Sequence, residues 1–369
     1  MRSPALATLA GICAVLILPC AAYAQSNPLP LGQVKGPVRS VACPEGFEQG
    51  TACYSGTVSC PDTDDLGFVY GVTNPRGSKG TVVFFNGEDG TTPGFQQYVA
   101  AYVSSNFQTV QVTWDTAWED TGVGTGNSLK SAACRPATVM DWLLNQKNAY
   151  AGGGMCAQGA SAGSAAVGYA LAEYGASGYL NHVELQSGPV LSDVSVGCNS
   201  NSQSMTVCSG NQCLTGEQGS WPDLPTYVDG AETAVSTWTG AFGNSACNSG
   251  NNVPQSQYTA WKQMSIVDGL NDSIFTYPRT SMTGWLCSKP EGCNGSWCQN
   301  NSAAQGQLYY QNVTTSKQVY RVDNCLGTEG TDNGTVPALN EETGLQAVIA
   351  SMVNQCGQNS GNTRPPANY

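Results

Sequence analysis

Short apolar runs alternate with longer amphipathic segments along most of the chain. A short apolar run rich in β-branched and aromatic residues is typical of a buried strand, whereas apolar positions three and four apart indicate a helix. This pattern predicts strands at 68–72, 81–85, 109–114, 154–158, 182–186, 280–286 and 318–322, and helices at 96–105, 135–146, 162–174 and 342–355. Strands that alternate with helices in this way predict an α/β fold, with a mostly parallel sheet flanked by helices.

The stretch 194–272 interrupts this alternation, because it is rich in Gly, Asn, Ser and Cys and has no regular apolar period. We interpret it as a disulfide-rich cap inserted into a single domain at 61–356. A Cys-rich N-terminal segment at 25–60 precedes that domain, and 357–369 is expected to be a flexible polar tail.

The first 24 residues have the features of a signal peptide. Arg2 precedes an apolar run at 11–18, and the small residues of Ala22-Tyr23-Ala24 provide a cleavage site. We therefore expect a secreted protein, either extracellular or periplasmic. Cys20 follows Pro19, which is a poor fit to lipoprotein processing, so no membrane anchor is expected.

Cysteine usage agrees with an oxidising compartment. Removal of Cys13 and Cys20 with the signal leaves 14 of the 16 cysteines, an even number that allows up to seven disulfides. Their pairing stays open. The chain contains one histidine and no CxxC pair, so neither a metal site nor a cofactor is expected.

The charge balance limits the partners. The net charge of the chain is −12, which disfavours nucleic acid and anionic membrane surfaces. After the signal, no apolar run approaches the ~20 residues that span a bilayer. We therefore expect the partner to be a small-molecule or polymer ligand, such as an ester or a glycan.

The sequence Gly159-Ala160-Ser161-Ala162-Gly163 has the G-x-S-x-G pattern of a nucleophile elbow. It lies between the strand predicted at 154–158 and the helix predicted at 162–174, which is the context that the motif requires. A serine hydroxyl attacks a carbonyl carbon efficiently only when a base accepts its proton and N–H groups stabilise the oxyanion. The alternative interpretation is an ordinary small-residue helix that follows a Gly-rich turn.

With this elbow, the chain from about residue 60 to 356 resembles the α/β-hydrolase superfamily, in particular the secreted serine esterases. The resemblance implies that Ser161 is the nucleophile and that the backbone N–H of Ala162 forms half of the oxyanion hole. The loop Asn86-Gly87-Glu88 would provide the other half, because glycine lets backbone amides approach a ligand closely; a simple turn is the alternative. A pocket is expected at the C-terminal edge of the sheet, lined by Trp114, Trp118, Glu119 and Ser187. The two tryptophans could equally be packing residues.

The same resemblance places an acid after the strand at 280–286 and a histidine before the last helix. The first loop contains Glu291, but the second, at 323–340, contains no histidine. The only histidine, His182, begins a predicted parallel strand, which puts it on the order of 15 Å from the elbow. A Ser-His-acid triad is therefore not expected, and His182 is interpreted as a structural residue.

Three interpretations of Ser161 remain. We favour a degenerate hydrolase that serves as a binding or structural protein. The second is an esterase with a carboxylate base, Glu329 or Asp332, with Glu291 as a further candidate base or acid. Such a base works best at acidic pH, or when burial raises its pKa. The third pairs Ser161 with Lys289, which requires a desolvated lysine.

Overall fold

The computed structural model describes residues 28–74, 76–77, 79–87, 90–119, 129–194, 205–209, 212–216, 255–267, 273–287, 300–322 and 342–358. Its strands are β1 (Gln33–Val41), β2 (Ala52–Ser59), β3 (Leu66–Thr73), β4 (Gly80–Phe85), β5 (Gln108–Trp114), β6 (Gly154–Ala160), β7 (His182–Gln186), β8 (Met205–Ser209), β9 (Gln212–Gly216), β10 (Ser281–Cys287) and β11 (Lys317–Val322). Its helices are α1 (Gln96–Ser104), α2 (Leu129–Leu143), α3 (Ala162–Glu173), the 3-10 helix η1 (Ala176–Gly178), α7 (Gln255–Met264), α8 (Asn300–Asn312) and α9 (Glu342–Gln358).

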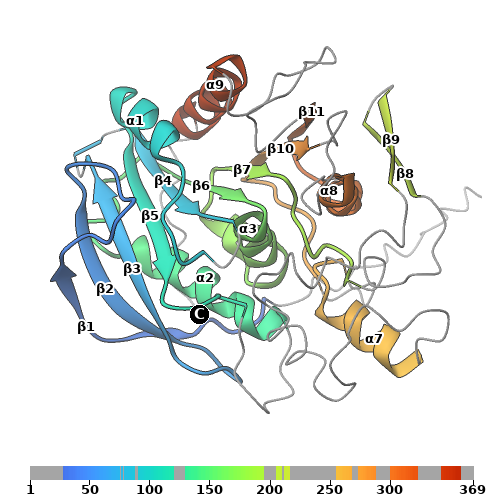
Figure 1. The fold of residues 1–369 in the computed structure, drawn as a ribbon, viewed down its shortest axis with the longest axis horizontal. Helices are drawn as coiled ribbons and strands as arrows, with labels where there is room; N and C mark the ends of the chain where they lie inside the picture. The colour runs from blue at the N-terminus through green and yellow to red at the C-terminus, as the bar shows by residue number, and fades with distance from the viewer. Residues whose placement is uncertain are drawn as a thin grey trace, which may run out of the picture.

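Nine of the strands form one sheet in the order β1-β2-β3-β5-β4-β6-β7-β10-β11 (Figure 1). The pairs β1–β2, β2–β3 and β3–β5 are antiparallel, whereas every pair from β5 to β11 is parallel. Helices cover both faces of this sheet, which confirms the predicted mostly parallel α/β architecture. The strand order, with the elbow after the central β6, is that of an α/β-hydrolase fold.

Parts of the fold differ from the sequence-based expectations, among them the segment 25–60, the start of α2 and the helix α8. No strand was expected in the segment 25–60, yet β1 and β2 lie there and extend the sheet. β1 is an edge strand that carries Lys35, Pro37 and Arg39, so it lacks the apolar run by which buried strands are recognised. In addition, α2 begins at Leu129 rather than at Arg135, so Pro136 lies inside this helix instead of at its start.

Within the predicted cap at 194–272, the structure describes the two-stranded sheet β8–β9 and the helix α7. It also describes residues 194 and 265–267, whereas the rest of that range and the predicted signal peptide at 1–24 lie outside the described residues. The predicted tail at 357–369 begins inside α9, which extends to Gln358, and its remainder is not described. Among the helices that are described, none is long and apolar enough to cross a membrane.

The two faces of the sheet differ in polarity. α2, α3 and α8 cover one face, whose core includes Val83, Phe85 and Leu185 (Figure 1). α1 and α9 cover the other face, where apolar residues such as Phe84 and Met352 pack beside polar side chains of the strands. Polar residues also form a row across the strands there: Gln158 of β6 pairs in register with Glu184 of β7, which pairs with Thr283 of β10. All three side chains are buried.

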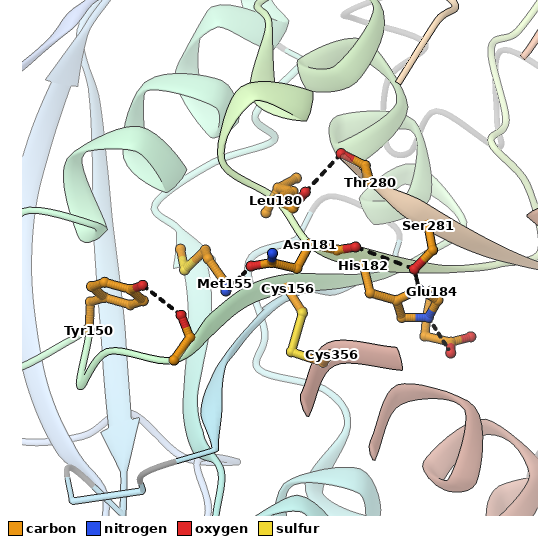
Figure 2. Close-up of a disulfide and its surroundings, with 11 residues drawn as sticks. Tyr150, Met155, Cys156, Leu180, Asn181, His182, Glu184, Thr280, Ser281 and Cys356 are labelled. Atoms are coloured by element: carbon orange, nitrogen blue, oxygen red, sulfur yellow. Dashed lines mark hydrogen bonds and ion pairs between the residues drawn. A yellow bond between two sulfur atoms is a disulfide. The ribbon is translucent and has the colours of Figure 1, made fainter. Parts of the chain in front are cut away.

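The described residues contain three disulfides, Cys43–Cys53, Cys60–Cys134 and Cys156–Cys356. The first joins cysteines 10 residues apart, and the other two connect elements that are distant in sequence. Cys60–Cys134 joins the end of β2 to α2, and Cys156–Cys356 joins β6 to α9 (Figure 2). The prediction of disulfides is confirmed for these six cysteines. The pairing of the remaining cysteines stays a prediction.

Candidate active site

The elbow is a turn made by one residue. β6 ends at Ala160 and α3 begins at Ala162, so Ser161 alone reverses the chain, with φ 52° and ψ −120°. A positive φ costs a non-glycine residue about 1–3 kcal/mol and persists only when the surroundings enforce it. Here the backbone N–H of Ser161 donates to the carbonyl of Gln186 (2.9 Å), and its carbonyl accepts from the backbone N–H of Ser164 (2.9 Å) and of Ala165 (3.1 Å).

The two glycines of the motif allow α3 to pack directly on the sheet. A Cβ atom on Gly163 would lie 1.9 Å from the carbonyl oxygen of Phe85 in β4, and one on Gly159 would lie 2.3 Å from the carbonyl oxygen of Gly163. Neither position has space for a side chain. The predicted sequence of strand, sharp turn and helix is thus confirmed as a structure, while the role of Ser161 as nucleophile stays a prediction.

Gly87 lies directly beside this elbow. A Cβ atom on Gly87 would be 3.0 Å from Cβ and 3.7 Å from Oγ of Ser161. The loop is held by its own hydrogen bonds, because Gly90 N–H donates to the Gly87 carbonyl (3.1 Å) and the Asn86 side chain donates to the Thr92 carbonyl (3.1 Å).

The second predicted oxyanion donor also borders Ser161. Ala162 is the first residue of α3, where a backbone N–H has no partner within the helix. Two of the three positions predicted for the oxyanion hole, Gly87 and Ala162, therefore adjoin the serine. Glu88 lies outside the described residues, and oxyanion binding itself stays a prediction.

Strained backbone gathers around the elbow. Among the described residues, four that are neither Gly, Asn nor Asp have positive φ: Phe95 (72°), Ser161 (52°), Ser187 (53°) and Leu191 (65°). All four lie on the chain that leaves the C-terminal ends of β4, β6 and β7. Asn and Asp tolerate this conformation through local hydrogen bonds, but these four residues do not. Because such strain clusters at functional sites, it indicates that this edge of the sheet is the candidate functional site.

His182 lies at the opposite edge. It pairs in register with Cys156, five residues before Ser161, which places it about 16 Å from the elbow. Its ring is fully buried, with Nδ1 bonded to Ser281 Oγ (2.8 Å) and Nε2 to Glu184 Oε1 (2.9 Å) (Figure 2). Both ring nitrogens are therefore occupied by neighbours in β7 and β10.

The predicted pocket residues are packed within the protein. Trp114 is 3% exposed and stacks near Phe85 at a ring distance of 6.4 Å. Trp118 is 1% exposed and meets the ring of Tyr169 edge-on. Glu119 and Ser187 are buried as well. These positions agree with the alternative of packing for the tryptophans, and contact of the four side chains with a ligand stays a prediction.

The hydroxyl of Ser161 is not used to cap α3, although serine is a preferred N-cap residue. The candidate bases Glu291, Glu329 and Asp332, and the alternative Lys289, lie outside the described residues, so their roles stay predictions. Within the described ranges, no group of three His, Cys, Asp or Glu side chains is arranged to hold a metal ion.

Sequence reasoning missed two residues behind the elbow, Gln186 and Tyr98. Gln186 is the acceptor of the Ser161 N–H, and its side chain donates to the Tyr98 hydroxyl (2.9 Å). The only signal in the sequence is the alternation of polar residues His182, Glu184 and Gln186 along β7, which is typical of side chains on one face of a strand.

No family model matches this chain, and no curated protein sequence does. Acetyl xylan esterase 1 from Thermoanaerobacterium sp. aligns with a TM-score of 0.48 and 10% identity over 90% of this chain and 91% of that one. An acetyl xylan esterase from Paenibacillus sp. aligns with a TM-score of 0.46 and 12% identity over 88% and 89% of the two chains. A dienelactone hydrolase from Anabaena variabilis aligns with a TM-score of 0.36 and 12% identity over 88% and 97%. This chain has the α/β-hydrolase fold by its own strand order and elbow.

Proposed function

We propose that this chain is a secreted serine hydrolase of carboxylic esters that works without a histidine base. The observation that carries the proposal is the conformation of Ser161, with φ 52° and ψ −120°. Glycine adopts a positive φ without strain, so stability alone favours glycine at this position. Serine at this position adds backbone strain, and its hydroxyl does not stabilise the helix by capping it. A role as nucleophile explains both the strained backbone and the uncapped helix.

The surroundings of Ser161 suit the chemistry of acyl transfer. Ser161 Oγ would attack the ester carbonyl carbon while a base accepts its proton, and the carbonyl oxygen would become an oxyanion. The loop at Gly87 and the N-terminus of α3 at Ala162 would stabilise that charge, because free backbone N–H groups and the helix dipole both favour an anion. Collapse of the intermediate would release the alcohol, which takes up the proton, and water would then hydrolyse the acyl-enzyme.

The base in this proposal is a carboxylate. His182 is about 16 Å from Ser161 and is engaged by Ser281 and Glu184. The candidates are therefore Glu329, Asp332 and Glu291. A carboxylate with an ordinary pKa of about 4 stays ionised at pH 5, where most histidine, with a pKa of about 6.5, is protonated. We therefore expect activity that persists well into the acidic range.

One observation favours a second function, a binding or structural protein with a retained hydrolase fold. The only histidine in the chain is buried and hydrogen-bonded to Glu184, and loss of the base histidine costs known triads roughly 10⁶ in turnover. In this case the elbow would persist as an inherited part of the fold. The ligand would be an ester or a glycan.

Ester hydrolysis by the mature, oxidised protein from about pH 3 to 8 separates the two functions. We expect hydrolysis that vanishes in Ser161→Ala and falls as pH drops through the pKa of a carboxylate. Glu329→Gln, Asp332→Asn and Glu291→Gln would then identify the base. Identical traces for the wild type and Ser161→Ala across this range would overturn the hydrolase and favour the binding protein.

A further inference from the structure

Gln186 contacts two separate parts of the candidate site. Its backbone carbonyl accepts the N–H of Ser161 (2.9 Å), and its side-chain Nε2 donates to the hydroxyl of Tyr98 (2.9 Å). Gln186 is 5% exposed and Tyr98 is 3% exposed, so the side-chain bond lies inside the protein. A hydrogen bond in such a position is costly to break, because each polar group would be left buried without that partner.

Tyr98 belongs to the first turn of α1, directly after the loop that contains Gly87. The Tyr98 N–H donates to the carbonyl of Phe95, the N-cap residue that directly precedes the helix (2.8 Å). The loop in front of it is fixed by Gln111 of β5, whose side chain donates to the Gly94 carbonyl (2.5 Å). The bond between Gln186 and Tyr98 thus ties the end of β7, which holds Ser161, to the far end of the Gly87 loop.

β7 provides a rigid base for this link. His182, Glu184 and Gln186 alternate along the strand and face α1 and α9. His182 forms a hydrogen bond with Ser281 of β10, and Glu184 accepts a hydrogen bond from Trp285 Nε1 of β10 (2.5 Å). Two buried polar contacts therefore fix the strand before it reaches Gln186.

The link does not depend on pH within the range of the proposed activity. Burial raises the pKa of Tyr98 far above its usual value, the hydrogen bond from Gln186 opposes this rise, and the charge of Glu184 adds to it. The phenol therefore stays neutral, and the Gln186 amide does not titrate. The titratable side chains around the link are Glu184 and His182 of β7 and Tyr102 of α1.

We propose that Gln186 is a positioning residue that fixes Ser161 relative to the Gly87 loop through its bond to Tyr98. This inference rests on the proposed function for its effect on catalysis, but not for its effect on geometry. The nucleophile and one half of the oxyanion hole come from different strand ends, and the reaction requires them in a fixed relation.

The chain contains a matched control for this link. Tyr102 lies one turn further along α1, is buried, and donates its hydroxyl to Gln158 Oε1 (2.7 Å). Tyr98→Phe and Tyr102→Phe each remove one buried phenol oxygen that is paired with a glutamine of the sheet. Only the first of these glutamines accepts the Ser161 N–H. A general loss of packing would affect both variants alike.

Amide hydrogen exchange of the full, oxidised chain tests the geometry without any need for activity. We expect the Ser161 amide to exchange about tenfold faster in Tyr98→Phe and in Gln186→Met, and at the wild-type rate in Tyr102→Phe. Unchanged exchange in Tyr98→Phe, or equal acceleration in the two tyrosine variants, would overturn the inference whatever the activity.

Kinetics test the catalytic consequence. In Tyr98→Phe we expect kcat for ester hydrolysis to fall about tenfold with KM unchanged, because the defect lies in transition-state alignment. The inflection of the pH profile should not move, whereas loss of the base would remove it. A fall in kcat shared by Tyr102→Phe would overturn the inference and leave the hydrolase intact. A third outcome is that the Ser161 amide exchanges faster in Tyr98→Phe but not in Tyr102→Phe, while the wild type shows no hydrolysis that depends on Ser161. This outcome would refute the hydrolase and retain the positioning role.

Discussion

Ser161 has a backbone conformation in which glycine is unstrained and serine is not. We expect Ser161→Gly to raise the free energy of unfolding by about 1 kcal/mol, because relief of the strain exceeds the extra entropy that glycine gives the unfolded chain. The same substitution should abolish ester hydrolysis. Urea unfolding and an ester assay on one preparation would measure both effects. Ser161→Ala is the control, since it removes the hydroxyl and keeps the strain; a Ser161→Gly protein less stable than wild type would contradict this account of the elbow.

The glycines of the elbow are required by space. Gly163→Ala would place a methyl group 1.9 Å from the Phe85 carbonyl, so α3 must move away from the sheet. We expect the free energy of unfolding to fall by about 2 kcal/mol or more, as in other overpacked sites. Gly178→Ala is the matched control, because nothing lies within 4 Å of its added carbon. Thermal unfolding of the two variants would show the difference, and equal melting temperatures would refute the packing argument.

At the residue scale, local features could be predicted from the sequence and distant pairings could not. The turn at Ser161 is determined by neighbours within a few positions, and the G-x-S-x-G pattern predicts it. The bond between Tyr98 and Gln186 joins residues 88 positions apart, so it depends on which strand lies beside which helix. The proposed base for Ser161 depends on tertiary position in the same way, and the sequence alone does not distinguish between the candidate carboxylates Glu291, Glu329 and Asp332.

At the element scale, β7 explains why the only histidine is absent from the elbow. His182 forms a hydrogen bond with Glu184 in which the side chains are 1% and 0% exposed, and a second hydrogen bond with Ser281. We expect His182→Ala to lower the free energy of unfolding by about 3 kcal/mol, because the buried Glu184 carboxyl would lose one of its hydrogen-bond partners and a cavity would form where the ring was. The pH inflection of any ester hydrolysis should stay in place, since His182 is not the base.

The control for His182→Ala is Lys35→Ala, which removes the ion pair between Lys35 of β1 and Asp65, the residue before β3. Both side chains of that pair are about half exposed, at 52% and 45%, so its loss should change stability little. Urea unfolding of the two variants would compare the loss of a buried polar contact with the loss of an exposed ion pair. A His182→Ala protein as stable as Lys35→Ala would show that the buried pair has no structural importance.

The elements that could be predicted are those with strong apolar periodicity. β4, β5 and β7 lie within a residue of their expected positions. β4 is a nearly continuous apolar run, whereas apolar residues alternate with polar ones along most of β5 and β7. β1, an exposed edge strand, and α8, which begins Asn300-Asn301-Ser302, have weaker apolar patterns and were not expected. Their structure depends on pairing with neighbours and not on a pattern of their own.

For the whole molecule, the disulfides connect what the sheet topology brings together. Cys156 in β6 and Cys356 in α9 are 200 residues apart, and both are fully buried. The sequence predicts disulfides from the number of cysteines, but their pairing depends on the completed fold. This link closes the part of the chain that includes the elbow, β7, β10 and β11, so it holds the closing helix against the strand that carries Ser161 (Figure 2).

Chain closure gives these disulfides a predictable order of importance. The three links span 200, 74 and 10 residues. In the chain-entropy model their removal costs about 5, 4 and 3 kcal/mol, because the longest loop restricts the unfolded chain most. We expect guanidinium unfolding of the paired Cys-to-Ala variants to show the largest loss of stability for the 200-residue link and the smallest for the 10-residue link. The double variant Cys156→Ala/Cys356→Ala should therefore be the least stable of the three. A variant with all six of these cysteines changed to alanine is the reference for loss of the three links. Equal losses for the 200-residue and 10-residue links would mean that the native contacts of each disulfide, rather than closure of the chain, determine its contribution.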